Sequence, residues 1–188
     1  MNIISQIWTS LRVAIVTMLI CSGLYTLAIL AAGQAFTPAT ANGSIIQGEH
    51  GEAVGSELIA QRFTQPEYLW PRPSVVDYDA AATGGSNLSP AGEAVRQRVE
   101  ESIRLFNKAN QPAISADLVM ASGSGLDPHI TEQAALFQAG RIAKARGLDC
   151  AVIEKVIQSR GVRPGWVLTD EPLVNVLQVN IDLDKTSR

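Results

Sequence analysis

A long uncharged stretch near the N-terminus restricts the fold of this chain more than any other feature. No charged residue lies between Val13 and Gly48, and residues 11–32 are almost wholly apolar. About 20 helical residues, rising about 1.5 Å each, cross the roughly 30 Å hydrocarbon core of a bilayer. The sequence therefore predicts one transmembrane helix over residues 11–32, preceded by a short segment over residues 1–10.

A cleaved signal peptide is the alternative for the same stretch. The small residues Ala39, Thr40 and Ala41 resemble a cleavage site. However, the apolar run is longer than the roughly 7 to 15 residues of a signal-peptide core, and residues 1–11 contain neither Lys nor Arg. We therefore favour an uncleaved anchor and keep cleavage as the alternative.

The few charges around the apolar stretch predict its orientation. Arg12 and the N-terminal amine are the only positive charges on its near side, and the next Lys or Arg is Arg62. Positive residues mark the cytoplasmic end of a membrane helix. This rule places residues 1–10 in the cytoplasm, the helix in the cell inner (plasma) membrane, and the remainder of the chain on the periplasmic side.

Length and composition predict one soluble domain beyond the membrane. Residues 33–55 are rich in Thr, Pro, Ala, Asn and Gly without periodicity, which is typical of a linker. Residues 56–188 are enough for one ordinary core and too few for two. We predict the fold class α+β for this compact extracytoplasmic domain, helix-rich and with a small sheet.

Capping residues, glycines and the spacing of apolar residues predict the elements of this domain. In chain order they are a short helix over residues 56–63, a helix opened by Ser89 with Val95, Val99, Ile103 and Phe106 on one face, a strand or buried turn over residues 116–121, a helix from Asp127 or Thr131 to Arg146, a helix from Asp149 to Ser159, and a terminal strand over residues 175–183. Helices thus outnumber strands.

Charge and cysteine content exclude several classes of function. The net charge is -3 and no basic stripe interleaved with aromatic residues is present, so a nucleic acid partner is not expected. Cys21 lies in the apolar stretch and Cys150 far along the soluble part, which predicts no disulfide. His50 in the linker and His129 lack companion ligands, so no metal site is expected either.

One constellation contains the ingredients of an acyl-transfer triad. Ser122, Ser124, Asp127 and His129 supply hydroxyl, carboxylate and imidazole groups. A nucleophile elbow requires Gly-x-Ser-x-Gly at a strand-to-helix turn, whereas the run here is Ser-Gly-Ser-Gly. A structural or interface role is therefore favoured, no catalytic residue is assigned, and a membrane-tethered extracytoplasmic serine hydrolase or binding module remains the alternative.

Two glycine-serine loops could offer backbone N–H groups to a phosphate. They are Gly84, Gly85, Ser86 and Asn87, and the run from Ser122 to Gly125. Neither loop contains a lysine, and the chain has no Gly-x-x-x-x-Gly-Lys-Ser/Thr sequence. Autonomous nucleotide hydrolysis is therefore not supported.

Several runs of residues resemble one known family. They are Gly55 to Phe63, Arg72-Pro73-Ser74 with Tyr78, Gly84 to Leu88, Ala116 to Val119, Ala121 to Ile130, Arg141-Ile142-Ala143 with Ala145-Arg146-Gly147, and Val174 to Leu177 with Asn180, Asp182 and Leu183. In this order they resemble the small C subunit (KdpC) of the bacterial Kdp-type potassium-transporting P-type ATPase. The stretch Ser122 to Ile130 is the most specific, and the runs cover nearly the whole chain.

The resemblance implies a non-catalytic accessory subunit of an ATP-driven, high-affinity potassium uptake complex. The implied partners are a channel-like potassium-translocating subunit and an ATP-hydrolysing P-type subunit, all in the lipid bilayer. The family's small subunit is held to be needed for assembly and to act as a catalytic chaperone that raises the ATP affinity of the pump subunit. The resemblance thus implies no cofactor of its own, but ATP shared with the pump subunit.

The predicted topology conflicts with direct contact to ATP, because a domain outside the cytoplasm cannot meet cytoplasmic nucleotide. A subunit that caps the external mouth of the potassium path fits this topology better. On the resemblance, the candidate surface for subunit contact is formed by the two glycine-serine loops. Its residues are Gly84, Gly85, Ser86, Asn87, Ser122, Gly123, Ser124, Asp127 and His129. Turn formation and capping are equally open roles for them.

Overall fold

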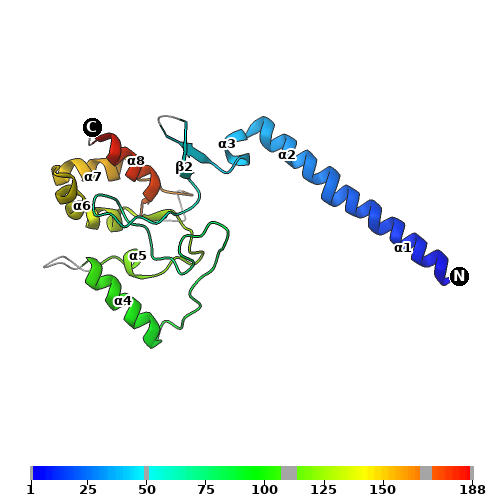
Figure 1. The fold of residues 1–188 in the computed structure, drawn as a ribbon, viewed down its shortest axis with the longest axis horizontal. Coiled ribbons are helices and arrows are strands. Elements are labelled where there is room, and N and C mark those ends of the chain that lie inside the picture. The colour runs from blue at the N-terminus through cyan, green and yellow to red at the C-terminus, as the bar shows by residue number, and fades with distance from the viewer. Residues whose placement is uncertain (1, 49–50, 107–113, 166–170, 187–188) are drawn as a thin grey trace. The chain divides into compact units, whose positions relative to one another are not determined.

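Figure 1 shows the protein as a computed structural model in which residues 2–48, 51–106, 114–165 and 171–186 are described. The chain forms two units, Met1–Ile45 and Ile46–Arg188. His50, considered above as a metal ligand, lies outside the described residues. The two units are treated separately below.

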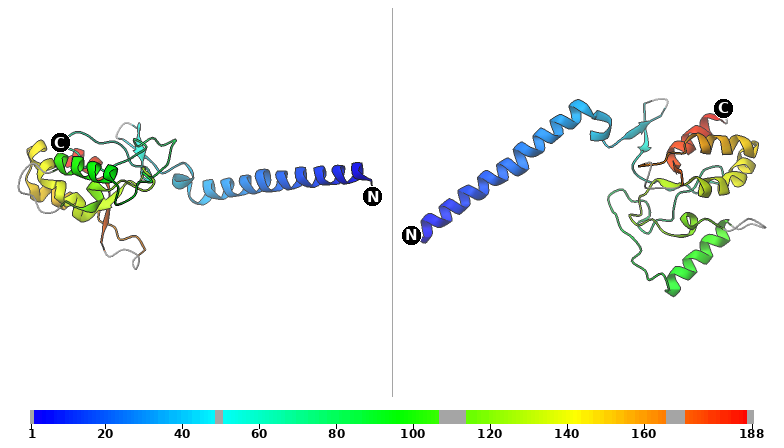
Figure 2. Two further views of the ribbon diagram at one scale, coloured as in Figure 1. Left: turned by 90° about the horizontal axis from the view of Figure 1, so that it is seen from below. Right: turned by 180° about the vertical axis from the view of Figure 1, so that it is seen from behind.

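The first unit is dominated by one long apolar helix. It consists of α1 (Ile3–Met18), the π-helical segment η1 (Leu19–Leu24) and α2 (Tyr25–Phe36), which run on without a break (Figure 2). The combined helix has 34 residues, and its most apolar 18-residue window has a mean hydropathy of 2.3 and contains no buried residue. At about 1.5 Å per residue it is about 51 Å long, so it exceeds a bilayer core of roughly 30 Å. By length and composition it can cross a membrane, and it contains the predicted span 11–32.

Two threonine side chains of this helix hydrogen-bond to the helix's own backbone. The Thr9 hydroxyl donates to the Ser5 carbonyl, and the Thr17 hydroxyl donates to the carbonyls of Val13 (2.9 Å) and Ala14 (3.0 Å). In hydrocarbon an unsatisfied polar group costs several kcal/mol. These back-bonds therefore make the threonines compatible with a membrane-spanning position.

The segment predicted as a linker contains regular structure. The residue before Pro38 leaves the helical region, which ends α2 and opens α3 (Pro38–Ala41). Further on, β1 (Ile45–Gln47) and β2 (Ala53–Ser56) form a two-stranded sheet. These strands have 3 and 4 residues, which is too short for an alternating apolar pattern to predict them.

The core of the second unit is built by three helices and a small sheet. They are α6 (Glu132–Arg146), α7 (Cys150–Ser159), α8 (Val176–Thr186), and the antiparallel pair β3 (His129–Thr131) and β4 (Leu173–Asn175). Three alanines of α6, Ala134, Ala135 and Ala139, are fully buried, and α6 packs against α7. Larger apolar residues fill the remaining space: Leu69, Leu118, Ile130, Ile142, Ile153, Ile157, Val174, Val179 and Leu183. This core confirms the helix-rich α+β class.

Capping explains the bounds of α6 and α7. Thr131 Oγ1 accepts from the Ala134 N–H (3.2 Å), and Asp149 Oδ1 accepts from the Ala151 N–H (2.9 Å). Gly147 ends α6 at φ 67°, in the left-handed region that glycine adopts without steric cost. The predictions for these two helices are confirmed.

The helix α4 (Glu93–Phe106) lies with the short helix α5 (Ala116–Val119) to one side of this core (Figure 1). The predicted helix is confirmed, although it begins later than Ser89. Its inner face differs in detail, because Ser102 is buried while Ile103 is 37% exposed. The region 116–121 begins as one helical turn rather than a strand.

Two predicted elements are wrong. Residues 56–63 form no helix: Ser56 ends β2, and the Leu58 N–H bonds to the Ser56 hydroxyl in a turn. The predicted terminal strand over residues 175–183 is mostly α8. Its alternating pattern ignored Leu177 and Asn180, which are also buried, so that the buried positions follow the helical period.

An extended segment between the sheet and α4 is fixed by two buried amides. Asn180 Oδ1 accepts from the Leu69 N–H (2.7 Å), and Asn180 Nδ2 donates to the Leu69 carbonyl (3.0 Å). In the same way, Gln138 Oε1 accepts from the Trp70 N–H (3.0 Å), and Gln138 Nε2 donates to the Trp70 carbonyl (3.1 Å). Each side chain thus replaces a neighbouring strand, and together these amide clamps hold Leu69 and Trp70 against α6 and α8.

Candidate functional site

The two predicted glycine-serine loops meet in the structure. The Gly84 N–H donates to the Ser124 carbonyl (2.9 Å), and the Thr83 hydroxyl donates to the same oxygen (3.0 Å). A Cβ at Gly85 would lie 2.9 Å from the Gly123 carbonyl oxygen, closer than ordinary van der Waals contact. Segments about forty residues apart therefore form one backbone surface, and only glycine permits this approach.

The serine hydroxyls of the second loop close its turn. Ser122 Oγ accepts from the N–H groups of Gly125 (3.2 Å) and Asp127 (3.4 Å), and Ser124 Oγ accepts from Leu126 (3.1 Å). Ser122 is only 2% exposed. Hydroxyls that accept from nearby backbone N–H groups stabilise turns. The capping role considered for these serines is thus visible in their geometry.

His129 lies beside Asp127. The His129 N–H donates to Asp127 Oδ1 (3.0 Å), and Nδ1 of the ring lies 3.4 Å from the same oxygen. The hydrogen bond from His129 lowers the pKa of the Asp127 carboxyl below its ordinary value, against a smaller opposing effect of burial. Within the described residues, neither Ser122 nor Ser124 hydrogen-bonds to His129. The arrangement therefore gives no support to a serine nucleophile activated by a base.

A shallow hollow of about 520 Å³ opens over this second loop. It is lined by Leu58, Ile59, Ser122, Gly123, Ser124, Leu126, Asp127, Pro128 and His129. The first loop, Gly84 to Asn87, supports Ser124 and Gly123 but does not line the hollow. The Leu58 side chain is 57% exposed at its edge. Such a hollow, open and partly apolar, is suited to contact with another protein rather than to enclosing a reaction.

Metal binding can be considered for the described ranges only. Across residues 2–48, 51–106, 114–165 and 171–186, no three His, Cys, Asp or Glu side chains gather as a ligand set. Both cysteines, Cys21 and Cys150, are free.

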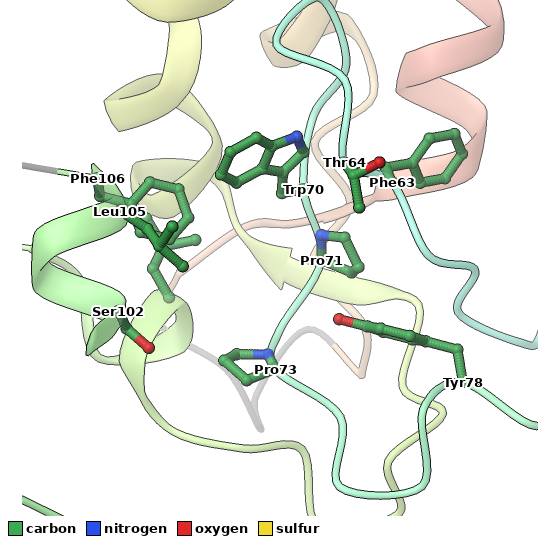
Figure 3. A pocket seen from close by; sticks show the side chains of 10 residues that line it. Phe63, Thr64, Trp70, Pro71, Pro73, Tyr78, Ser102, Leu105 and Phe106 are labelled. Atoms are coloured by element: carbon green, nitrogen blue, oxygen red, sulfur yellow. The ribbon is translucent and has the colours of Figure 1, made fainter. Parts of the chain in front are cut away.

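Sequence reasoning missed an aromatic cavity on another side of the second unit. This cavity, of about 370 Å³, lies between α4 and the clamped segment (Figure 3). Its wall includes Trp70, Pro73 and Tyr78 from the segment and Phe106 from α4, and the Trp70 and Phe106 ring centroids are 5.4 Å apart. The density of aromatic residues and prolines between Tyr68 and Pro73 was the signal that could have found it.

Comparison with known proteins identifies the family. The family model described as KdpC, the c chain of the K+-transporting ATPase, matches residues 7–185. The chain belongs to the KdpC family. The potassium-transporting ATPase KdpC subunit of Parvibaculum lavamentivorans is 45% identical over 176 residues, covering 94% of this chain and 94% of that protein. The expected resemblance is confirmed.

Further relatives carry the same description. The KdpC subunit of Geobacter sulfurreducens is 40% identical over 174 residues, covering 90% of this chain and 92% of that protein. The KdpC subunit of a Caulobacter species is 45% identical over 163 residues, covering 85% and 83%. KdpC proteins are subunits of a K+-transporting ATPase, and the apolar helix of this chain fits a membrane-anchored subunit of such a complex.

Proposed function

We propose that this chain is a non-catalytic accessory subunit of an ATP-driven potassium uptake complex and is needed for its assembly. Its partners in this proposal are a channel-like potassium-translocating subunit and an ATP-hydrolysing P-type subunit. The observation that carries the proposal is the KdpC family match over residues 7–185, which includes both the apolar helix and the soluble unit.

The geometry of the predicted loops supports a contact role over a catalytic one. The serine hydroxyls are engaged with backbone N–H groups of their own turn, and His129 is engaged with Asp127. The hollow above them exposes Leu58 and a rigid backbone surface, which are features of protein contact sites. We propose that this hollow, backed by Gly84 to Asn87, is one surface that contacts another subunit.

The proposed orientation places residues 1–10 in the cytoplasm and the second unit on the periplasmic side. The only charged residue of the first 48 is Arg12, near the N-terminal end of the helix. In this orientation the soluble unit lies where it can cap the external mouth of the potassium path. Labelling of single-cysteine variants at Ser5 and at Lys155 with a membrane-impermeant maleimide, in intact spheroplasts lacking the native cysteines, tests it. Reaction at position 155 and protection at position 5 are expected; the reverse pattern would contradict the orientation.

A finer proposal is that the subunit raises the ATP affinity of the pump subunit. A tenfold change in affinity corresponds to a coupling free energy of about 1.4 kcal/mol. With the soluble unit outside the cytoplasm, this coupling acts through the membrane helix or the conformation of the pump rather than by direct contact with ATP. Complexes prepared with and without the chain should differ in the KM for ATP, and equal KM values would refute this part.

Growth at limiting potassium tests the main proposal. A strain that lacks the chain should fail to grow at micromolar potassium and should recover when the chain is restored. A variant with Leu24→Arg and Leu27→Arg should not restore growth, because each arginine costs about 2.5 to 3.5 kcal/mol at the centre of a membrane helix. The surface variant Lys155→Gln is the control that should restore it. Unimpaired growth without the chain would contradict the proposal.

A further inference from the structure

A second hollow adjoins the aromatic cavity, on its α6 side. The two share Thr64, Trp70, Leu105 and Phe106. The second hollow has a volume of about 640 Å³, and its further lining residues include Arg141 and Lys144 of α6. We call this second hollow the Trp70 groove. It combines an apolar wall with two cations, and it lies apart from the glycine-serine loops described above.

Arg141 is held rigidly at the bottom of the Trp70 groove. Its guanidinium carbon lies 4.0 Å from the centroid of the Trp70 ring, and its nitrogens donate to the carbonyls of Pro66 (2.6 Å) and Tyr68 (3.0 Å) and to the Gln138 amide (2.6 Å). All of these acceptors are neutral, and within the described ranges Arg141 forms no ion pair. Burial accordingly lowers the pKa of Arg141 to about 10, which leaves it cationic at neutral pH.

Lys144 adds a second cation three residues further along α6. Its side chain is exposed, and no ion pair of Lys144 occurs among the residues that the structure describes. Residues three apart share one face of a helix, so both charges point to the same side of α6. Two acidic side chains of the same unit pair with other cations: Glu100 lies 3.7 Å from Arg104, and Asp184 lies 2.8 Å from Arg146.

The opposite wall of the Trp70 groove is apolar and exposed. Leu105 is 65% exposed although it lies beside the rings of Trp70 and Phe106 (Figure 3). No carboxylate is among the residues that line the groove in the described part of the chain. Trp and Arg held in a preformed pocket are the residue types that carry most binding energy in protein interfaces.

We propose that the Trp70 groove binds a segment of a larger subunit of the same complex, with an Asp or Glu carboxylate toward Arg141 and Lys144 and an apolar side chain against Leu105. This inference rests on the proposed function, because it presupposes that the chain works in a complex. The charge of the groove selects a carboxylate, because the ammonium of Lys144 and the positive charge of Arg141 both attract it.

A membrane surface is the competing anionic occupant, and the groove favours it less. Recognition of anionic lipid headgroups typically uses clusters of about four to eight Lys and Arg residues. The Trp70 groove has two cations, one of them recessed on a tryptophan ring, and an apolar wall beside them. A single carboxylate with an apolar neighbour fills such a site, whereas a lipid surface would leave its recessed cation out of reach.

Zero-length crosslinking tests the chemistry of the partner directly. A water-soluble carbodiimide joins a lysine amine to a carboxylate in contact with it, with loss of water. In the purified complex, peptide mapping should find Lys144 joined to an Asp or Glu of a larger subunit, and Lys155 of α7, which is also exposed, should be joined at most one-tenth as often. Absence of an intersubunit product at Lys144, or equal products at both lysines, would overturn the proposal.

Charge reversal tests whether the groove matters for association. Lys144→Glu and Leu105→Asp change exposed positions and should each raise the dissociation constant of the chain from the complex about tenfold or more. Lys144→Glu sets a carboxylate against the partner's carboxylate, and Leu105→Asp sets a charge against the partner's apolar side chain. The matched controls Lys155→Glu and Val152→Asp should change it less than about twofold. Unchanged binding of both groove variants to the complex would overturn the proposal. It would also be overturned if the variants bound the complex as the wild type does and lost binding only to vesicles that contain anionic lipid.

Co-purification of the wild-type chain and of the groove variants distinguishes a failure of this inference from a failure of the proposed function. Wild-type chain that does not co-purify with larger subunits contradicts the proposed function itself. Wild-type chain that co-purifies, together with groove variants that co-purify equally well, contradicts only the assignment of the Trp70 groove.

Discussion

Replacing Asn180 by leucine removes one of the two amide clamps that position the Trp70 groove. The Asn180 side chain is 2% exposed and makes both hydrogen bonds to the backbone of Leu69, which is itself fully buried. Leucine has a similar size but neither donor nor acceptor. Asn180→Leu therefore leaves one buried N–H and one buried C=O without partners.

The expected cost follows from these two groups. Each buried unsatisfied backbone group costs about 1 to 3 kcal/mol, or roughly 2 to 6 kcal/mol together. Burial of the added apolar surface returns roughly 1.5 kcal/mol. We expect the free energy of unfolding of the second unit to fall by about 2.5 kcal/mol.

Urea unfolding of the full chain in mild detergent, followed by circular dichroism, measures this loss as a shift of the midpoint at constant slope. Gln158→Leu, which makes the same change at an exposed position of α7, should alter the stability by less than about 0.5 kcal/mol. A loss for Asn180→Leu no larger than that of Gln158→Leu would refute the reasoning, because Leu69 would then be held by something other than the amide.

Three further predictions concern the loops and the anchor. Gly125→Ala should destabilise the second unit by roughly 1 to 3 kcal/mol in the same urea assay, because φ is 72° and the new Cβ would lie 2.5 Å from Val76; Gly123→Ala, with open space around it, should cost less than about 1 kcal/mol. The pKa of Asp127 is lowered in the folded state, so its ionised form contributes stability above the unfolded pKa of about 3.9. The difference in unfolding free energy between wild type and Asp127→Asn should therefore be constant near neutral pH and should vanish as the pH falls below about 4. A difference that grows on acidification would contradict this sign. Alkaline carbonate should leave the chain in the membrane fraction with residues 1–41 still attached, whereas a soluble product beginning at Asn42 would establish the cleaved signal peptide instead.

The helices that sequence predicted best are those with local signals at both ends. Thr131, Asp149 and Gly147 act on backbone groups within a few residues of themselves, so their roles can be recognised without knowing the fold. The helix α8 also has a local cap, because Asn175 Oδ1 accepts from the Gln178 N–H (3.2 Å), but Asn175 lies in the alternating pattern that predicted a strand. Whether residues 175–183 form a strand or a helix then depends on the contacts of Leu177 and Asn180. For Asn180 this contact is the hydrogen bond with the backbone of Leu69, 111 residues away in the sequence, which no local pattern reveals.

The candidate sites divide in the same way. The glycine and serine runs predicted two loops, and both loops are present. Their contact, the hydrogen bond from the Gly84 N–H to the Ser124 carbonyl, could be seen only in the structure. The Trp70 groove was missed because its parts come from three segments that no spacing rule connects. The sequence predicted no binding role for Arg141 or Lys144, because a cation on a helix surface carries no such signal by itself. The packing of α4 against the clamped segment makes them part of a hollow.

The π-helical segment η1 has a consequence for insertions and deletions in the membrane helix. A turn closed by i→i−5 bonds holds one residue more than an α-helical turn closed by i→i−4 bonds. Loss of a single residue between Leu19 and Leu24 therefore converts the segment to α-helix and leaves the facing of α1 and α2 nearly unchanged. The same loss within α2 rotates every later side chain by about 100° relative to α1. Length variation among homologous membrane helices should accordingly be tolerated at this one segment and selected against elsewhere in the span.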